Sequence, residues 1–157
     1  MSHHEPWRPE RAAEIIATGA REQGATLPIL HALQQAFGHI PEAAILMVAE
    51  ALNLTRAEVH GVVSFYHDFR REPAGRHVLK LCRAEACQSM GGEALAAQAQ
   101  AALAVGWGGT TADHAVTLEP VYCLGLCATA PAALLDGRPV GRLDRGRLLA
   151  LLDEAQA

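Results

Sequence analysis

The first half of the chain spaces its apolar residues with the period of an α-helix. In four short stretches apolar side chains recur three, four or seven positions apart, which places them on one helical face. Prolines stand at or near the start of the first three stretches, and Gly38 follows the second, as a glycine often follows a helix. The pattern therefore predicts four helices with short connections, over residues 10–22, 28–37, 41–53 and 55–67.

The fourth stretch carries its own start signal, because Thr55 with Glu58 three residues later forms a capping box. Its aromatic residues cannot all lie on one helical face, so we expect Tyr66 in the core and one phenylalanine at a domain boundary. His60 and His67 lie seven positions apart without a third ligand at helical spacing. We therefore expect them to form a polar stripe rather than a metal site.

The pattern changes after residues 70–76, a charged segment that contains a proline and a glycine. Short apolar runs then predict buried strands over residues 77–81 and 115–118. A hairpin around Asp136-Gly137 and helices over residues 90–105 and after Asp144 complete this half. This order of elements is that of a small thioredoxin-like α/β domain. We therefore expect an α+β protein, with a helical bundle over residues 1–72 and a thioredoxin-like domain over residues 73–157.

Composition and charge exclude several classes of protein. Half of the 157 residues are hydrophobic and 19% are charged, which is typical of a globular chain. The formal charge of −4 is opposite to that of proteins that bind nucleic acid through its phosphates. No apolar stretch free of helix breakers is long enough for a membrane span, and the N-terminal residues lack the pattern of a secretory signal. We expect a cytoplasmic protein with no nucleic-acid partner and no membrane insertion.

The four cysteines are the strongest chemical signal in the sequence. They form the pairs Cys82-x4-Cys87 and Cys123-x3-Cys127, and each pair follows a predicted strand. Loops at the carboxyl ends of strands in an α/β sheet share one side of the domain. Two such loops bring four thiolates to a single site.

Three occupants compete for such a site. A [2Fe–2S] cluster needs two thiolates on each of two irons, which two separated pairs supply. A zinc-stapled interaction module usually uses tighter Cys-x2-Cys knuckles, and disulfides or redox-active thiols are disfavoured in a reducing cytoplasm. The spacing favours the cluster and leaves the other two open. Backbone N–H groups at Gly91-Gly92 and Gly125, and the charge of Arg83, would favour the reduced form of such a cluster.

The cysteine motif resembles a known family. The sequence Cys82-x4-Cys87…Cys123-Leu-Gly-Leu-Cys127-Ala-Thr-Ala-Pro131 is similar to that of the 24-kDa NADH dehydrogenase subunits, the thioredoxin-like [2Fe–2S] proteins of respiratory complex I and related NAD-linked enzymes. The resemblance implies a [2Fe–2S] cofactor. It also implies that Cys82 and Cys87 bind one iron, and Cys123 and Cys127 the other.

Further segments extend the resemblance over nearly the whole chain. Residues 29–38 and 58–66 are similar to two helical segments of the family. His60, residues 67–70 and residues 81–92 look most like the gamma subunit of NAD-dependent, molybdenum-containing formate dehydrogenase. This implies electron transfer beside an FMN- and NAD-binding subunit, in a complex with a larger catalytic subunit that contains molybdenum and iron–sulfur clusters. Equivalent subunits of complex I or of an NAD-reducing hydrogenase are the alternatives, and no activity is expected of the chain alone.

Overall fold

The computed structural model describes residues 4–156, which divide into two compact units between Pro73 and Ala74. Each unit has an apolar core of its own. Among the described residues, no helix is long and apolar enough to cross a membrane. The expected α+β fold class, with helices first and a sheet afterwards, is confirmed.

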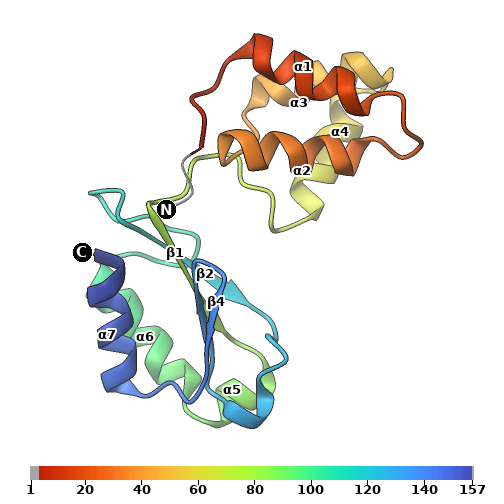
Figure 1. Ribbon diagram of the computed structural model, residues 1–157. Coiled ribbons are helices and arrows are strands. Elements are labelled where there is room, and N and C mark those ends of the chain that lie inside the picture. The colour runs from red at the N-terminus through yellow and green to blue at the C-terminus, as the bar shows by residue number, and fades with distance from the viewer. Residues whose placement is uncertain (1–3, 157) are drawn as a thin grey trace. The chain divides into compact units, whose positions relative to one another are not determined.

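The N-terminal unit consists of helices. In chain order they are α1 (Pro9–Gly19), α2 (Thr26–Phe37), α3 (Glu42–Leu52) and α4 (Arg56–Phe65) (Figure 1). Helix α1 packs against α2 and α3, and α4 packs against α3 and α2. Their apolar faces meet in a core whose fully buried members include Ile29, Leu30, Leu33, Ile45, Val48 and Val59.

Local sequence signals explain several of these helix ends. Gly38 ends α2 in the left-handed conformation, with φ of 75°, and its N–H donates to the carbonyl of Gln34 at 2.7 Å. Thr55 starts α4 through the predicted capping box. The Glu58 N–H donates to the Thr55 hydroxyl at 3.2 Å, and the Glu58 carboxylate accepts from the Thr55 N–H at 2.7 Å.

The end of α4 differs from the prediction. The helix stops at Phe65, and Tyr66 leaves it with φ of −88° and ψ of 104°. Tyr66 is therefore 44% exposed, and the buried aromatic residue is Phe69, whose ring lies 4.9 Å from that of His31. The expectation of a buried Tyr66 is wrong because the chain turns at that residue. His67 lies beyond the helix for the same reason, so it forms no helical stripe with His60.

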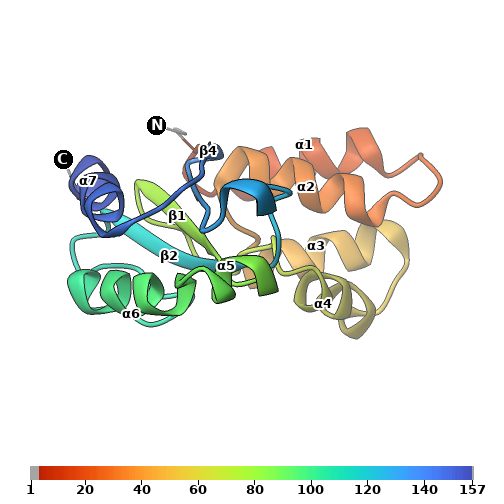
Figure 2. The same cartoon turned by 90° about the horizontal axis from the view of Figure 1, so that it is seen from below.

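The C-terminal unit is a four-stranded sheet with helices. Its strands are β1 (His77–Cys82), β2 (Val116–Val121), β3 (Ala133–Leu135) and β4 (Arg138–Val140), in the spatial order β2-β1-β3-β4. Strands β1 and β2 are parallel, whereas β3 is antiparallel to both β1 and β4. Helices α6 (Gly92–Leu103) and α7 (Arg145–Gln156) pack against each other and against β1 (Figure 2).

The predicted elements of this unit are present with shifted bounds. Asp136 and Gly137 both have positive φ, as a tight two-residue hairpin turn requires, and they join β3 to β4. Asp144 caps α7 by accepting the N–H of Arg147 at 2.8 Å. Two short elements were not predicted, the helix α5 (Glu85–Ser89) and the 3-10 helix η1 (Cys127–Thr129).

Candidate metal centre

Both cysteine pairs lie at one end of the sheet. Because β1 and β2 are parallel and Cys82 is paired with Val121, the two strands end side by side. Cys82 is the last residue of β1, and Cys87 lies within α5. Helix α5 lies just beyond the end of β1 (Figure 2). Cys123 stands two residues after β2, and Cys127 begins η1. The topology thus brings the predicted loops to the same edge.

The four side chains are free thiols that differ in burial. Cys82 and Cys87 are 6% and 2% exposed, whereas Cys123 and Cys127 are exposed. The Cys123 and Cys127 sulfur atoms lie 3.8 Å apart. Apolar side chains from both loops pack around the buried pair: Ala84, Val121, Leu124, Leu126, Ala130 and Ala132.

Backbone N–H groups of both loops converge on the Cys82 sulfur. Burial opposes ionisation of this thiol, but hydrogen bonds from the Ala84 N–H, the Cys87 thiol and the N–H groups of Cys123 and Leu124 outweigh it. The pKa of Cys82 is therefore lowered. Hydrogen bonds from both loops thus favour negative charge on this sulfur.

The pKa values of the Cys87 and Cys127 thiols are raised. Burial and the Cys82 thiol raise the pKa of Cys87, although the Ala132 N–H acts in the opposite direction. A hydrogen bond to Cys123 and the charge of that residue raise the pKa of Cys127. Adjacent thiols thus do not readily ionise together when no cation is present. A bound metal would stabilise their thiolate forms.

Glycines in the loops have different roles from those expected. The Gly125 N–H does point at a sulfur, since it lies 3.4 Å from the Cys123 Sγ, and its φ of 73° favours glycine. The Gly91 N–H instead donates to the Gln88 carbonyl at 3.0 Å, so the expectation that it faces the cluster is wrong. Gly92 is needed for space, because a Cβ atom there would lie 2.5 Å from the Cys87 carbonyl oxygen.

The donor set fits a [2Fe–2S] cluster. Two pairs of thiols face each other from two loops, and a binuclear cluster takes two thiolates on each iron. Within residues 4–156, no three Cys, His, Asp or Glu side chains converge on one position for a single metal ion. The N–H groups that surround the sulfurs would stabilise an anionic cluster. Sequence reasoning missed most of them, because a backbone donor has no residue type that marks it.

Comparison with known proteins agrees with this chemistry. The sequence profile of the thioredoxin-like [2Fe–2S] ferredoxin family matches residues 12–156. The chain belongs to this family. The expected thioredoxin-like fold and [2Fe–2S] cofactor are thereby confirmed.

Several curated relatives belong to one kind of enzyme. The chain is 38% identical to an NADH-quinone oxidoreductase subunit of Pseudomonas aeruginosa over 114 residues, which are 73% of this chain and 69% of that one. It is also 38% identical to an NADH-quinone oxidoreductase subunit of Rhizobium meliloti over 147 residues, 92% of this chain and 88% of the relative. The resemblance to the 24-kDa NADH dehydrogenase subunits is confirmed.

Solved structures of an NAD⁺-reducing [NiFe]-hydrogenase have the same fold. The air-oxidised form matches 83% of this chain with a TM-score of 0.70 and 32% identity, and the H₂-reduced form matches 81% with a TM-score of 0.68 and 35% identity. In both cases the match covers only 22% of the hydrogenase chain. The present chain thus spans about a fifth of that polypeptide.

Proposed function

We propose that this chain is the [2Fe–2S] electron-transfer subunit of a multisubunit, cytoplasmic NAD-linked oxidoreductase. The observation that carries the proposal is the convergence of two cysteine pairs at the carboxyl ends of the parallel strands β1 and β2. When bound, a [2Fe–2S] cluster accepts and releases single electrons. Cys82, Cys87, Cys123 and Cys127 are the residues that would hold it.

The protein contributes ligation, insulation and control of the potential. The apolar side chains around Cys82 and Cys87 exclude water from one side of the site. The N–H groups of Ala84, Leu124 and Gly125 point at sulfur atoms and favour added negative charge. Cys123 and Cys127 remain exposed, which leaves this side of the site open to a redox partner.

We propose that the partner is an FMN- and NAD-binding subunit. A flavin handles two electrons together, whereas this site handles one at a time, so a cluster beside the flavin can hold the second electron. The hydrogenase match supports a lasting partner, because there the corresponding region is part of a polypeptide about five times as long. A segment fused to further domains in one protein is expected to bind equivalent domains when it is a separate chain.

We further propose that the whole enzyme is an NAD-dependent formate dehydrogenase with a molybdenum-containing catalytic subunit. The support is the resemblance of residues 67–70 and 81–92 to the gamma subunits of such enzymes. The relatives found by comparison favour two other complexes, NADH-quinone oxidoreductase and NAD⁺-reducing hydrogenase. These are the competing identities.

Purification of the tagged chain from its native host tests both the electron-transfer function and the assignment to a formate dehydrogenase. We expect it to co-purify with a flavoprotein and a molybdenum protein, and the complex to reduce NAD⁺ with formate. Reduction of NAD⁺ by H₂, or of quinone by NADH, would assign the chain to one of the competing complexes. Zinc in place of iron and acid-labile sulfide in the chain would contradict the electron-transfer function itself.

A further inference from the structure

Arg83 occupies a central place between the two cysteine loops. It directly follows Cys82, and its backbone N–H donates to the Val121 carbonyl at 2.8 Å, at the end of β2. Its own carbonyl accepts a hydrogen bond from the Gln88 side chain at 2.8 Å. The backbone of Arg83 therefore connects the strand before Cys123 with the helix that contains Cys87.

The guanidinium group of Arg83 is held by two further side chains. One of its nitrogens donates to both carboxylate oxygens of Glu93, at 2.8 and 3.1 Å, and its central carbon lies 5.1 Å from the centre of the Trp107 ring. The side chain is 27% exposed. The hydrogen bond with Glu93 raises the pKa of Arg83. The cation is thus held by Glu93 and Trp107, one residue along the chain from Cys82, and is paired with one carboxylate.

A paired charge influences a redox centre differently from a free one. Four thiolates, two ferric ions and two sulfides carry a net charge of about −2, which becomes about −3 on reduction. A nearby cation favours the reduced form and a nearby anion opposes it, so the two members of an ion pair act in opposite directions. When one member of the pair is removed, the charge of the remaining member therefore sets the direction in which the midpoint potential shifts.

We propose that Arg83 and Glu93 form a charge-compensated pair that sets the reduction potential of the cluster. Arg83 favours the reduced form, and Glu93 limits that effect while holding the guanidinium in place against Trp107. This inference rests on the proposed function, since it needs the [2Fe–2S] cluster. Both residues are positioning and electrostatic groups that bind no iron.

Redox titration of the purified full-length chain, followed by EPR, tests the pair. Glu93→Gln leaves an uncompensated cation and is expected to raise the midpoint potential, whereas Arg83→Gln leaves an uncompensated anion and is expected to lower it. Each shift should correspond to a change of about threefold to tenfold in the reduction equilibrium, or about 30 to 60 mV for one electron. The double variant should have a midpoint potential close to that of the wild type. Arg83→Lys keeps the positive charge, so its midpoint potential should also stay near the wild-type value.

The pair Arg138–Glu154 provides a matched control. One nitrogen of Arg138 donates to both carboxylate oxygens of Glu154, at 2.7 Å each, so the geometry resembles that of the proposed pair. Arg138 faces Leu135 in the sheet, and Leu135 faces Leu79, away from the end of β1 where Cys82 lies. Arg138→Gln and Glu154→Gln should leave the potential unchanged.

The outcomes separate the inference from the function on which it rests. Opposite shifts in the two single variants support the pair, because a merely structural role would move both in the same direction. Unchanged potentials, shifts of the same sign, or loss of the cluster from both glutamine variants would overturn it. If only Arg83→Gln loses the cluster, an upward shift in Glu93→Gln supports the pair and an unchanged value overturns it. Absence of a [2Fe–2S] signal from the wild-type chain would instead overturn the proposed function.

Discussion

At the scale of single residues, the site combines side chains that supply sulfur with backbone groups that supply hydrogen bonds. The sulfurs come from four positions, two buried and two exposed. Besides the Cys87 thiol, the hydrogen bonds to the Cys82 sulfur come from the backbone N–H groups of Ala84, Cys123 and Leu124. Ligation of the proposed cluster would therefore depend on residue type at four positions and on backbone conformation at several others.

Replacing any one cysteine by alanine should remove most of the cluster, because no spare thiol lies in either loop. We expect Cys82→Ala, Cys87→Ala, Cys123→Ala and Cys127→Ala to lose at least half of the iron and acid-labile sulfide, together with the EPR signal of the reduced protein. Met90→Ala is a suitable control, because Met90 is 63% exposed close to the first cysteine loop. Full cluster content in any cysteine variant would show that the residue is not a ligand.

Gly92→Ala should also impair the cluster, for a steric reason. The new Cβ atom would lie 2.5 Å from the Cys87 carbonyl oxygen, so the loop that holds Cys87 has to move. We expect a loss of about 1–3 kcal/mol in the free energy of unfolding and reduced iron content. Gly61→Ala is the matched control, since apart from the backbone of its own helix nothing lies within 4 Å of its Cβ position, and it should retain full iron content. Equal iron content in both variants would contradict the steric argument.

At the scale of elements, the start of α4 followed local sequence, whereas its end and the cysteine loops did not, and α2 begins at Thr26, before the predicted start at Pro28. The capping box starts α4 at the predicted residue, because its hydrogen bonds join residues only three positions apart. The end of α4 is different, since burial of Phe69 against His31 takes precedence over continuation of the apolar stripe through Tyr66. Helix α5 is only five residues long, too short to show a helical period.

Thr55→Ala should destabilise the N-terminal unit by about 1 kcal/mol, the usual cost of a lost N-cap. Hydrogen bonds from the Thr55 N–H and the Thr55 hydroxyl lower the pKa of Glu58, so their stabilisation is present above the usual pKa of a glutamate and is lost as the pH falls through the lowered value. Thr55→Ala keeps the N–H and removes only the hydroxyl, so the part of the difference from wild type that comes from the hydroxyl–carboxylate bond should be larger at pH 7 than at pH 3. Urea unfolding followed by circular dichroism measures the difference, and a value independent of pH would show that the bond between the Thr55 hydroxyl and the Glu58 carboxylate contributes nothing.

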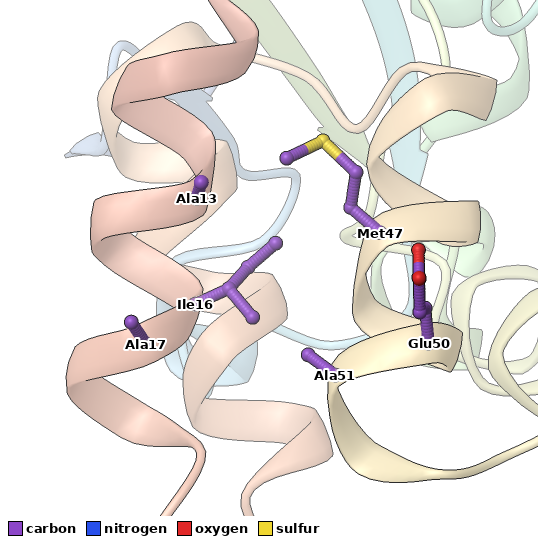
Figure 3. Close-up of a pocket in the computed structure, with 6 residues that line it drawn as sticks. All are labelled: Ala13, Ile16, Ala17, Met47, Glu50 and Ala51. Carbon is purple, nitrogen blue, oxygen red and sulfur yellow. The ribbon is translucent and has the colours of Figure 1, made fainter.

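At the scale of the whole molecule, the two units have separate cores, and only one of them contains cysteines. All four cysteines lie in the unit after Pro73, while the N-terminal unit contains no cysteine. The N-terminal unit also has a groove of about 270 Å³ between α1 and α3, which is lined by small and apolar side chains together with Glu50 (Figure 3). All of the lining residues belong to this unit. We propose that residues 1–72 and 73–157 are separate folding domains.

Removal of the cluster should then destabilise one domain only. Because metal binding contributes folding energy to the residues that it joins, a chelated chain should exchange amide hydrogens faster in β1, β2 and the cysteine loops. Helices α1 to α4 should keep the same exchange rates and serve as the internal control. Hydrogen exchange followed by mass spectrometry measures both, and faster exchange throughout the chain would show that the two units unfold together.

The isolated chain should have no dehydrogenase activity. It carries neither a nucleotide-binding motif nor a nucleophile with an evident base, and the site has one-electron chemistry only. We expect no reduction of NAD⁺ by formate with the pure chain and restored activity when the flavin- and molybdenum-containing subunits are added. Turnover by the chain alone would contradict a purely electron-transferring role.

Local sequence was enough to predict the order of the longer elements, the four candidate cysteine ligands and a division near residue 72. Apolar periodicity, capping residues and cysteine spacing are local features, and each depends on residues a few positions apart. Motif spacing also marked the four sulfurs, because only cysteine supplies thiolate.

Tertiary packing decided which backbone N–H groups surround the Cys82 sulfur and which side chain pairs with Arg83. The pairing of β1 with β2 brings the two loops together across more than thirty residues, and only then do the N–H groups of Cys123 and Leu124 reach the Cys82 sulfur. Glu93 is the partner of Arg83 because α6 packs against β1 and so places the Glu93 side chain beside the residue that follows Cys82. A local pattern carries no information about such neighbours, since they depend on how the sheet and helices pack.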